Sequence, residues 1–272
     1  MRLSYTLARR AQRAARFIRE LVGAGGKRLW WAAPGTRADK GAWAAGGGDP
    51  GWRSTMKRRK AVLQLMRRER LVGVIRAPTQ ETAERAARAW VEGGVRLVEI
   101  PLTVPGALGL IKTLSALPEA CIGAGSILDR EMAREAVAYG AQYIISPHTD
   151  SEVVQVCEEE DVFVAAGALT PTEVARAWNL GVDAVNVFPA AAVGGPEYVR
   201  ALKRPFPFIE MLPAGGITLE NCRAYLEAGA LAVGVADALL DRDAIERGQW
   251  SQVRETARAL AQRVRLASGA SG

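Results

Sequence analysis

One carboxylate stands inside an otherwise apolar run of the chain. The segment RLVEIP (96–101) has the composition of a buried β-strand, and Glu99 is its acidic residue. A buried carboxylate is costly unless it meets a cation or takes part in proton transfer. The segment therefore predicts either a general base at Glu99 or a structural ion pair of Glu99 with Arg76 or Arg96. The first interpretation is favoured, because perturbed carboxylates gather at functional sites.

Other residues with binding or catalytic potential follow the remaining apolar runs. They are Arg76, Thr103, Ser126, Pro147, His148, Asn186, Gly215, Gly216 and the segment Gly234 to Asp237. Glycine pairs at such places either hold a phosphate on backbone N–H groups or form tight turns. His148 could act as an acid or could orient a loop through its backbone. Because it is the single histidine, a site with several histidine ligands is excluded.

Eight short apolar runs would position these residues. They span 72–77, 96–101, 121–127, 143–147, 162–169, 184–189, 209–216 and 231–237. Their unbroken hydrophobicity is typical of parallel strands buried on both faces. The segments between them have helical periodicity, with Thr79, Asp129, Thr170-Pro171 and Thr218 as predicted helix starts. Glycines at 93–94, 140, 181 and 229 are the predicted helix ends.

Eight strand–helix units in about 200 residues predict a (β/α)8 TIM barrel. An open doubly wound sheet is the alternative, but no GxGxxG motif opens a helix after the first strand. An additional helix from about Thr55 to Arg70 is expected to pack across the N-terminal end of the barrel. In such a barrel, chemistry belongs at the carboxyl ends of the strands.

The basic charge of the chain is local. The 272 residues carry a net charge of +7, with a pI near 9.7. Residues 1–60 hold 15 Lys and Arg against 3 Asp and Glu, whereas residues 61–272 hold 21 against 26. We therefore predict a basic, disordered leader over 1–55 and a globular domain over 56–272. The leader could be a transit-type targeting segment, an arm that binds nucleic acid or membrane, or translated upstream sequence before a true start at Met56.

The cysteine spacing and the length of the apolar runs indicate the cellular compartment. Three widely spaced cysteines form no CxxC motif, which favours a reducing compartment. No run approaches the roughly 18 apolar residues of a transmembrane helix. A cytoplasmic protein is expected, or an organellar one if the leader is a genuine transit peptide, with no nucleic-acid or membrane partner.

Several motifs resemble one enzyme family. They are GGVRLVEIPLTVP (93–105), IGAGSI (122–127), ISPH (145–148), TPTE (170–173), VFP (187–189) and LPAGGI (212–217). In this order they resemble the 2-keto-3-deoxy-6-phosphogluconate (KDPG) and 4-hydroxy-2-oxoglutarate (KHG) aldolases, from about Arg70 to Leu240. The resemblance implies a homotrimer of TIM barrels that cleaves a 2-keto-4-hydroxy acid to pyruvate and an aldehyde, without a cofactor. In the family a lysine on strand six forms a Schiff base, and a glutamate on strand two carries protons.

The resemblance assigns roles to residues of this chain. Glu99 matches the proton-carrying glutamate. Substrate-binding positions match Arg76, Thr103, Pro147, His148 and Ala214. The phosphate-binding turns match Gly215, Gly216, Gly234, Ala236 and Asp237.

The chain departs from the family pattern at three of these places. The family reads Lys-x-Phe-Pro where this chain reads Asn186-Val-Phe-Pro, and an amide cannot form an imine. Lys112 and Lys203 lie in predicted helices and offer no replacement. Ala214 stands where the family often has threonine, and Asp237 where it often has serine; an aspartate facing the site would repel a phosphate.

Two alternatives to imine chemistry follow. The protein could be a lyase or decarboxylase for an oxaloacetate-like 2-keto acid, with Glu99 as base and Asn186 as hydrogen-bond donor to an enolate. Such a site could recruit Mg²⁺ or Mn²⁺ through Glu99, Asp237 or His148. Alternatively, it could be a non-catalytic relative that binds a keto acid or serves as a structural trimer. A nucleic-acid binder would depend on the leader alone.

Overall fold

The computed structural model describes residues 58–236, 244–245 and 247–266, all within the second of two units, Asp49–Gly272. The predicted leader, Met56 and Asp237 lie outside these ranges. The strands are β1 (Leu71–Val74), β2 (Leu97–Pro101), β3 (Cys121–Gly125), β4 (Tyr143–Ile145), β5 (Phe163–Ala168), β6 (Ala184–Val187), β7 (Met211–Pro213) and β8 (Val233–Val235). The helices are α2 (Arg58–Glu69), α3 (Gln80–Glu92), α4 (Ala107–Leu114), α5 (Arg130–Ala138), α6 (Ser151–Glu159), α7 (Pro171–Leu180), α8 (Gly195–Lys203), α9 (Cys222–Glu227) and α11 (Trp250–Leu266), with a 3₁₀ turn η1 (Ala191–Val193).

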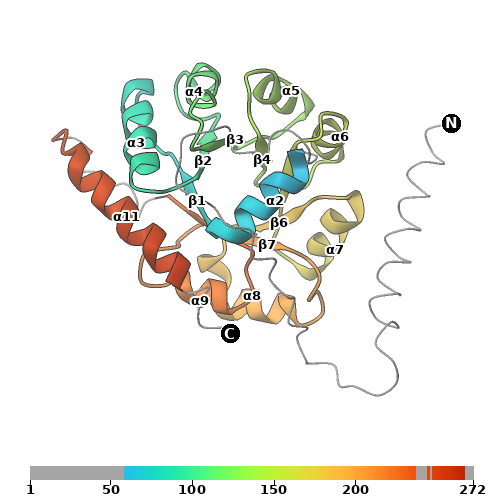
Figure 1. The fold of residues 1–272 in the computed structure, drawn as a ribbon. Coiled ribbons are helices and arrows are strands. Elements are labelled where there is room, and N and C mark those ends of the chain that lie inside the picture. Colours follow the sequence, from blue (N-terminus) through green and yellow to red (C-terminus); the bar gives the residue numbers. More distant parts are fainter. Residues whose placement is uncertain (1–57, 237–243, 246, 267–272) are drawn as a thin grey trace. The chain divides into compact units, whose positions relative to one another are not determined.

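The eight strands form one parallel sheet with the order β7-β6-β5-β4-β3-β2-β1-β8. A parallel bridge between Ala214 and Gly234 joins the two end strands and closes the sheet. Helices surround this barrel on the outside (Figure 1). The predicted (β/α)8 TIM barrel is therefore confirmed, and the open doubly wound sheet is excluded.

Local sequence signals explain where three of the helices begin. Thr79 and Asp129 accept hydrogen bonds from the backbone N–H groups of Thr82 (3.2 Å) and Met132 (2.9 Å). Thr170 forms a capping box with Glu173 in front of α7. These three predicted helix starts are confirmed.

Thr218 caps the turn that leads into helix α9, but the helix itself begins four residues later than predicted. Helix α9 begins at Cys222, with Asn221 before it, and the residues from Leu219 to Asn221 form a turn. The Asn221 Oδ1 accepts a hydrogen bond from the Thr218 N–H at 2.8 Å. In return, the Thr218 Oγ1 accepts the Asn221 N–H at 3.4 Å, and the Thr218 carbonyl accepts the Cys222 N–H at 3.0 Å.

Alternate strand residues point into the barrel. An inner cluster contains the first inward residue of several strands, including Val72, Leu97, Tyr143, Phe163 and Leu212. The larger outer cluster fills the layer between strands and helices. Because side chains alternate along a strand, the inward positions above this cluster include Val74, Glu99 and Asn186.

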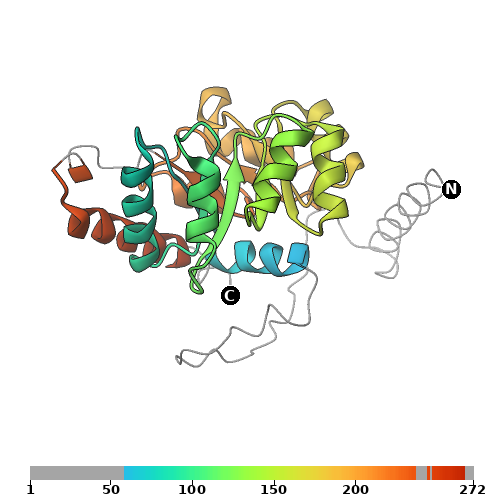
Figure 2. The same ribbon diagram turned by 90° about the horizontal axis from the view of Figure 1, so that it is seen from above.

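Helix α2 covers the N-terminal end of the barrel, as predicted. Figure 2 shows it crossing that end beneath the strands. Its buried Val62 and Met66 belong to the inner cluster. The helix closes the barrel from below.

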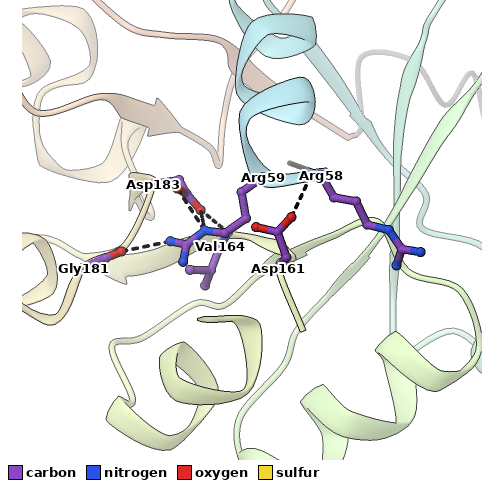
Figure 3. A network of polar contacts seen from close by, with 6 residues as sticks. All are labelled: Arg58, Arg59, Asp161, Val164, Gly181 and Asp183. Atoms are coloured by element: carbon purple, nitrogen blue, oxygen red, sulfur yellow. Dashed lines mark hydrogen bonds and ion pairs between the residues drawn. The ribbon is translucent and has the colours of Figure 1, made fainter. Parts of the chain in front are cut away.

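A polar network anchors α2 to the barrel (Figure 3). The Arg59 guanidinium donates from Nε to both carboxylate oxygens of Asp183 (3.2 and 3.0 Å) and from Nη2 to the Gly181 carbonyl (3.0 Å). Asp183 also accepts the Val164 N–H at 3.0 Å. The Arg58 N–H, at the beginning of α2, donates to Asp161 at 2.7 Å.

We expect Asp183→Ala to lower the free energy of unfolding by about 3 kcal/mol, because it leaves a nearly buried guanidinium and a strand N–H without their acceptor. The side chains of Arg59 and Asp183 are only 14% and 16% exposed. Equilibrium denaturation in urea measures the change. Arg67→Ala is the control: it removes an ion pair with Glu210 whose arginine is 55% exposed and should cost less than about 1 kcal/mol.

Candidate active site

A cavity of about 420 Å³ lies at the carboxyl ends of the strands. Nine of the predicted site residues line it: Arg76, Glu99, Pro147, Asn186, Ala214, Gly215, Gly216, Gly234 and Ala236. They come from six of the eight strands or from the loops directly after them. The barrel thus brings together residues that lie up to 160 positions apart in the sequence.

Glu99 reaches into this cavity from the inner face of β2. A glycine on the next strand makes this possible: a Cβ at Gly125 would lie 1.8 Å from the Glu99 Oε1. The side chain is buried, and burial raises its pKa to about 8, although attraction to Arg76 opposes the shift. No ion pair joins Glu99 to Arg76 or Arg96 within the described part of the chain. The structural ion pair is therefore not formed, and a carboxyl group that changes charge near neutral pH remains.

Arg76 lies at the mouth of the cavity, directly after β1. Its side chain is exposed, and among the described residues that line the cavity it is the one cation. A guanidinium in this place can bind a carboxylate through two parallel hydrogen bonds. The cavity is suited to a ligand that carries a carboxylate at its outer end.

Asn186 lies deeper, on the inner face of β6. Its Nδ2 donates a 2.9 Å hydrogen bond to the Ser146 carbonyl. Its Oδ1 is buried and has no hydrogen-bond partner among the described residues. Since a carbonyl can only accept, this bond fixes the amide with its NH₂ group toward Ser146. The free Oδ1 can accept a hydrogen bond from a ligand.

The Gly215-Gly216 turn forms another wall. Both glycines have positive φ angles, 88° and 74°, and a Cβ at Gly216 would lie 2.4 Å from the Ala191 Cβ. The Ala214 methyl packs over Gly234, where an added Cβ would lie 3.0 Å away. The predicted tight turn is therefore present. Phosphate binding by the same turn stays a prediction.

Two predicted site residues lie elsewhere, and a third is not described. Thr103 is exposed in the loop after β2 and is not among the cavity residues. His148 lines a neighbouring cavity of about 750 Å³, between the loops after β4 and β5. Its backbone carbonyl accepts the Gly167 N–H at 3.1 Å, and its N–H donates to the Ser146 Oγ at 3.2 Å. This geometry supports a loop-orienting role for His148. Asp237 lies outside the described residues.

The cavity also contains residues that the sequence did not single out as site residues. They are Val74, Ile145, Phe188, Ile217 and Thr218, whereas Ser126, also in the cavity, was among the candidates. Strand alternation could have indicated Ile145 and Phe188, because each is two residues from a predicted site residue. Nothing local indicates Thr218, which reaches the cavity through the turn after Gly216.

The described residues show neither a metal-binding cluster nor a membrane-spanning helix. They contain no group of three or more His, Cys, Asp or Glu side chains that could hold a metal ion. Within the same ranges, no helix has the length and apolar character needed to cross a membrane. The lysines in these ranges, at 60, 112 and 203, do not line the cavity.

Comparisons with known proteins agree with this geometry. A family model described as KDPG and KHG aldolase matches residues 62–256. The 2-dehydro-3-deoxy-phosphogluconate aldolase of Treponema pallidum is 31% identical over 71% of this chain and 92% of its own length. The KHG/KDPG aldolase of Escherichia coli K12 is 30% identical over 72% and 92%.

Solved structures show the same relationship. The KDPG aldolase of Legionella pneumophila, crystallised with pyruvate as a covalent carbinolamine, is 27% identical and has a TM-score of 0.66 over 73% of this chain and 97% of that one. These matches cover most of the (β/α)8 barrel, including Glu99 in its cavity. The chain belongs to the KDPG and KHG aldolase family, whose members are lyases.

Proposed function

We propose that the protein is a carbon–carbon lyase that cleaves a 2-keto-4-hydroxy acid to pyruvate and an aldehyde, and that it does so without a Schiff base. The observation that carries the proposal is Glu99, a buried carboxyl group with a pKa of about 8 in a cavity that Arg76 also lines. The names of the relatives support the substrate class, since they are aldolases for KDPG and for KHG.

Glu99 would carry the proton through the reaction. Its carboxylate takes the proton of the C4 hydroxyl while the C3–C4 bond breaks, which releases the aldehyde. The bonding electrons pass to the C2 carbonyl oxygen and form an enolate. The protonated Glu99 then returns the proton to C3, and pyruvate is formed. Arg76 would hold the carboxylate of the keto acid during these steps.

Asn186 is the reason to propose an enolate in place of an enamine. It occupies the position that the family motif gives to lysine, and an amide nitrogen does not attack a ketone. No described lysine lines the cavity. The negative charge on the C2 oxygen must then be stabilised by the Arg76 charge, because no iminium is present. The donor role predicted for Asn186 does not fit this geometry, since its NH₂ group is held by Ser146 and its free atom is the acceptor Oδ1.

Two measurements on the wild-type protein test this function. Release of pyruvate is followed with KHG and with KDPG as substrates, and the protein is treated with pyruvate and borohydride before intact-mass analysis. We expect pyruvate release together with an unchanged mass. A borohydride-stable adduct would contradict the enolate route, whereas binding of pyruvate without turnover on either substrate would contradict the lyase and favour a non-catalytic relative.

We also propose a homotrimer in the cytoplasm. One similar chain, 30% identical, is part of a designed protein cage made by fusing symmetric oligomeric domains. The three cysteines are all buried, and widely spaced cysteines without a CxxC motif favour a reducing compartment. Light scattering coupled to size-exclusion chromatography should give three times the chain mass.

A further inference from the structure

A buried phenol lies in the same row of the barrel as Glu99. In the register of β2 and β3, Glu99 is opposite Gly123. In the register of β3 and β4, Ala124 is opposite Ile144 and Gly125 is opposite Ile145, so Gly123 lies beside Tyr143. Glu99 and Tyr143 therefore flank one glycine, about 10 Å apart at their Cα atoms.

Both side chains lie against the inner face of β3. A Cβ at Gly123 would lie 2.2 to 2.4 Å from three ring atoms of Tyr143, so the phenol ring covers this glycine. The Glu99 carboxylate covers Gly125, two residues further along the same face. The two glycines are about 7 Å apart. The phenol and the carboxyl group thus occupy neighbouring places on one strand, with no side chain of β3 between them.

Neither group has a hydrogen-bond partner in the described part of the chain. Tyr143 is fully buried, and its hydroxyl is among the unpartnered buried polar atoms. Glu99, which is 7% exposed, has no described hydrogen bond to its carboxyl group. A buried polar group left unpaired is costly, and the cost is larger when the group is charged. The two groups can satisfy each other when Glu99 is ionised.

We infer that Tyr143 is a positioning residue for Glu99, whose carboxylate accepts a hydrogen bond from the Tyr143 hydroxyl, directly or through one water molecule. The inference rests on the proposed role of Glu99 as the base. Arg76 would face the carboxylate from the mouth of the cavity, and Tyr143 would stabilise it from below. The barrel would then hold the base in one orientation before substrate binds.

The surroundings of Tyr143 keep it a donor. Burial and the nearby Cys121 and Glu99 raise its pKa well above the usual tyrosine value, so it remains protonated. The titratable groups around Glu99 inside the barrel are Arg76, Cys121 and Tyr143. A thiol is a weak hydrogen-bonding group, so the phenol is the stronger donor from below.

Tyr143→Phe removes only the hydroxyl and tests the inference. Without the donor, the carboxylate form of Glu99 is less stable, so the acid limb of the pH–rate profile should move upward by about one unit. The rate of pyruvate release at pH 7 should fall about tenfold. The thermal unfolding temperature should remain close to that of the wild type, since ring packing is kept.

Tyr225→Phe is the matched control. Tyr225 is also fully buried with an unpartnered hydroxyl, but it lies on α9, outside the barrel interior. This variant should leave the pH–rate profile unchanged. Equal profiles for the wild type and Tyr143→Phe would overturn the inference, and so would equal shifts in both variants.

A second readout does not depend on turnover. The carboxyl C=O band of Glu99 is assigned by difference infrared spectroscopy, as the band lost in Glu99→Gln, and is titrated with pH. We expect the pH midpoint of this titration to be higher in Tyr143→Phe than in the wild type, and to be unchanged in Tyr225→Phe. An unchanged midpoint in Tyr143→Phe contradicts the inference. If the wild type shows no lyase turnover, the proposed function fails while this titration still decides the role of Tyr143.

Discussion

Asn186→Lys should give the protein a borohydride-trappable adduct with pyruvate and should raise kcat/KM for pyruvate-releasing cleavage by roughly 100-fold, about 3 kcal/mol of activation free energy. Residue 186 faces the cavity from the inner side of β6, and its Oδ1 is unpartnered there. The amine introduced by the substitution would enter the same space. Burial and the Arg76 charge lower the pKa of such an amine, which favours the neutral, nucleophilic form.

The double substitution Asn186→Lys with Ala214→Thr should increase the gain, because it also restores a hydroxyl beside the amine. Asn186→Met is the control: it adds a side chain of similar length without an amine and should form no adduct. Intact mass after reduction gives the adduct, and coupled detection of pyruvate gives the rate. If the lysine variants fold but trap no pyruvate, the cavity has diverged from imine chemistry at further positions.

Glu99→Gln should lower pyruvate release by about 10²- to 10⁴-fold, because the amide cannot carry the proton. In the wild type the rate should rise with pH as Glu99 ionises around its pKa of about 8 and level off above it. The pH–rate profile of Glu99→Gln should lack this rise, because the variant has no carboxyl group at residue 99. Initial rates between pH 6 and pH 9.5 measure both effects.

The same substitution should change how stability depends on pH. The pKa of Glu99 rises from 4.5 to about 8 on folding, so the folded state favours the protonated carboxyl group. The contribution of Glu99 to the free energy of unfolding is fully present below pH 4.5 and is lost as the pH rises through 8. The total loss is on the order of 5 kcal/mol. Glu99→Gln should therefore flatten the fall in unfolding free energy between pH 5 and pH 8.5, measured by urea denaturation.

Glu81→Gln is the control for both measurements. Glu81 is 83% exposed on α3 and lies outside the cavity. Its substitution should leave the rate and the stability profile unchanged. If Glu99→Gln retains wild-type turnover, Glu99 is not the base, and another group must carry the proton.

Most of the fold could be predicted from the sequence, because its signals are local. The eight apolar runs correspond to the eight strands, and Thr79, Asp129 and Thr170 cap helices as predicted. The strands are shorter than predicted where a turn begins early. The run 209–216 contains only β7, since Gly215 and Gly216 adopt positive φ angles and leave the sheet.

The candidate site could be predicted only in part. Glu99, Arg76 and Asn186 were found because polar residues stand out at the ends of apolar runs. The separation of His148 and Thr103 from the cavity depends on where each loop turns after its strand, and no local pattern encodes this direction. The proximity of the Glu99 and Tyr143 side chains depends on the strand register, which places Gly123 between them.

The sequence by itself determined the barrel, the helix that closes it and the carboxylate in its mouth, because burial, capping and strand periodicity are properties of short segments. The tertiary structure alone decided which side chains share the cavity and how far the pKa of Glu99 is raised. The cavity lining and the pKa of Glu99 both depend on atoms that lie far apart in the chain and meet only when the barrel closes. Desolvation of Glu99 requires all eight strands around it, and the row of Glu99, Gly123 and Tyr143 exists only in the paired register.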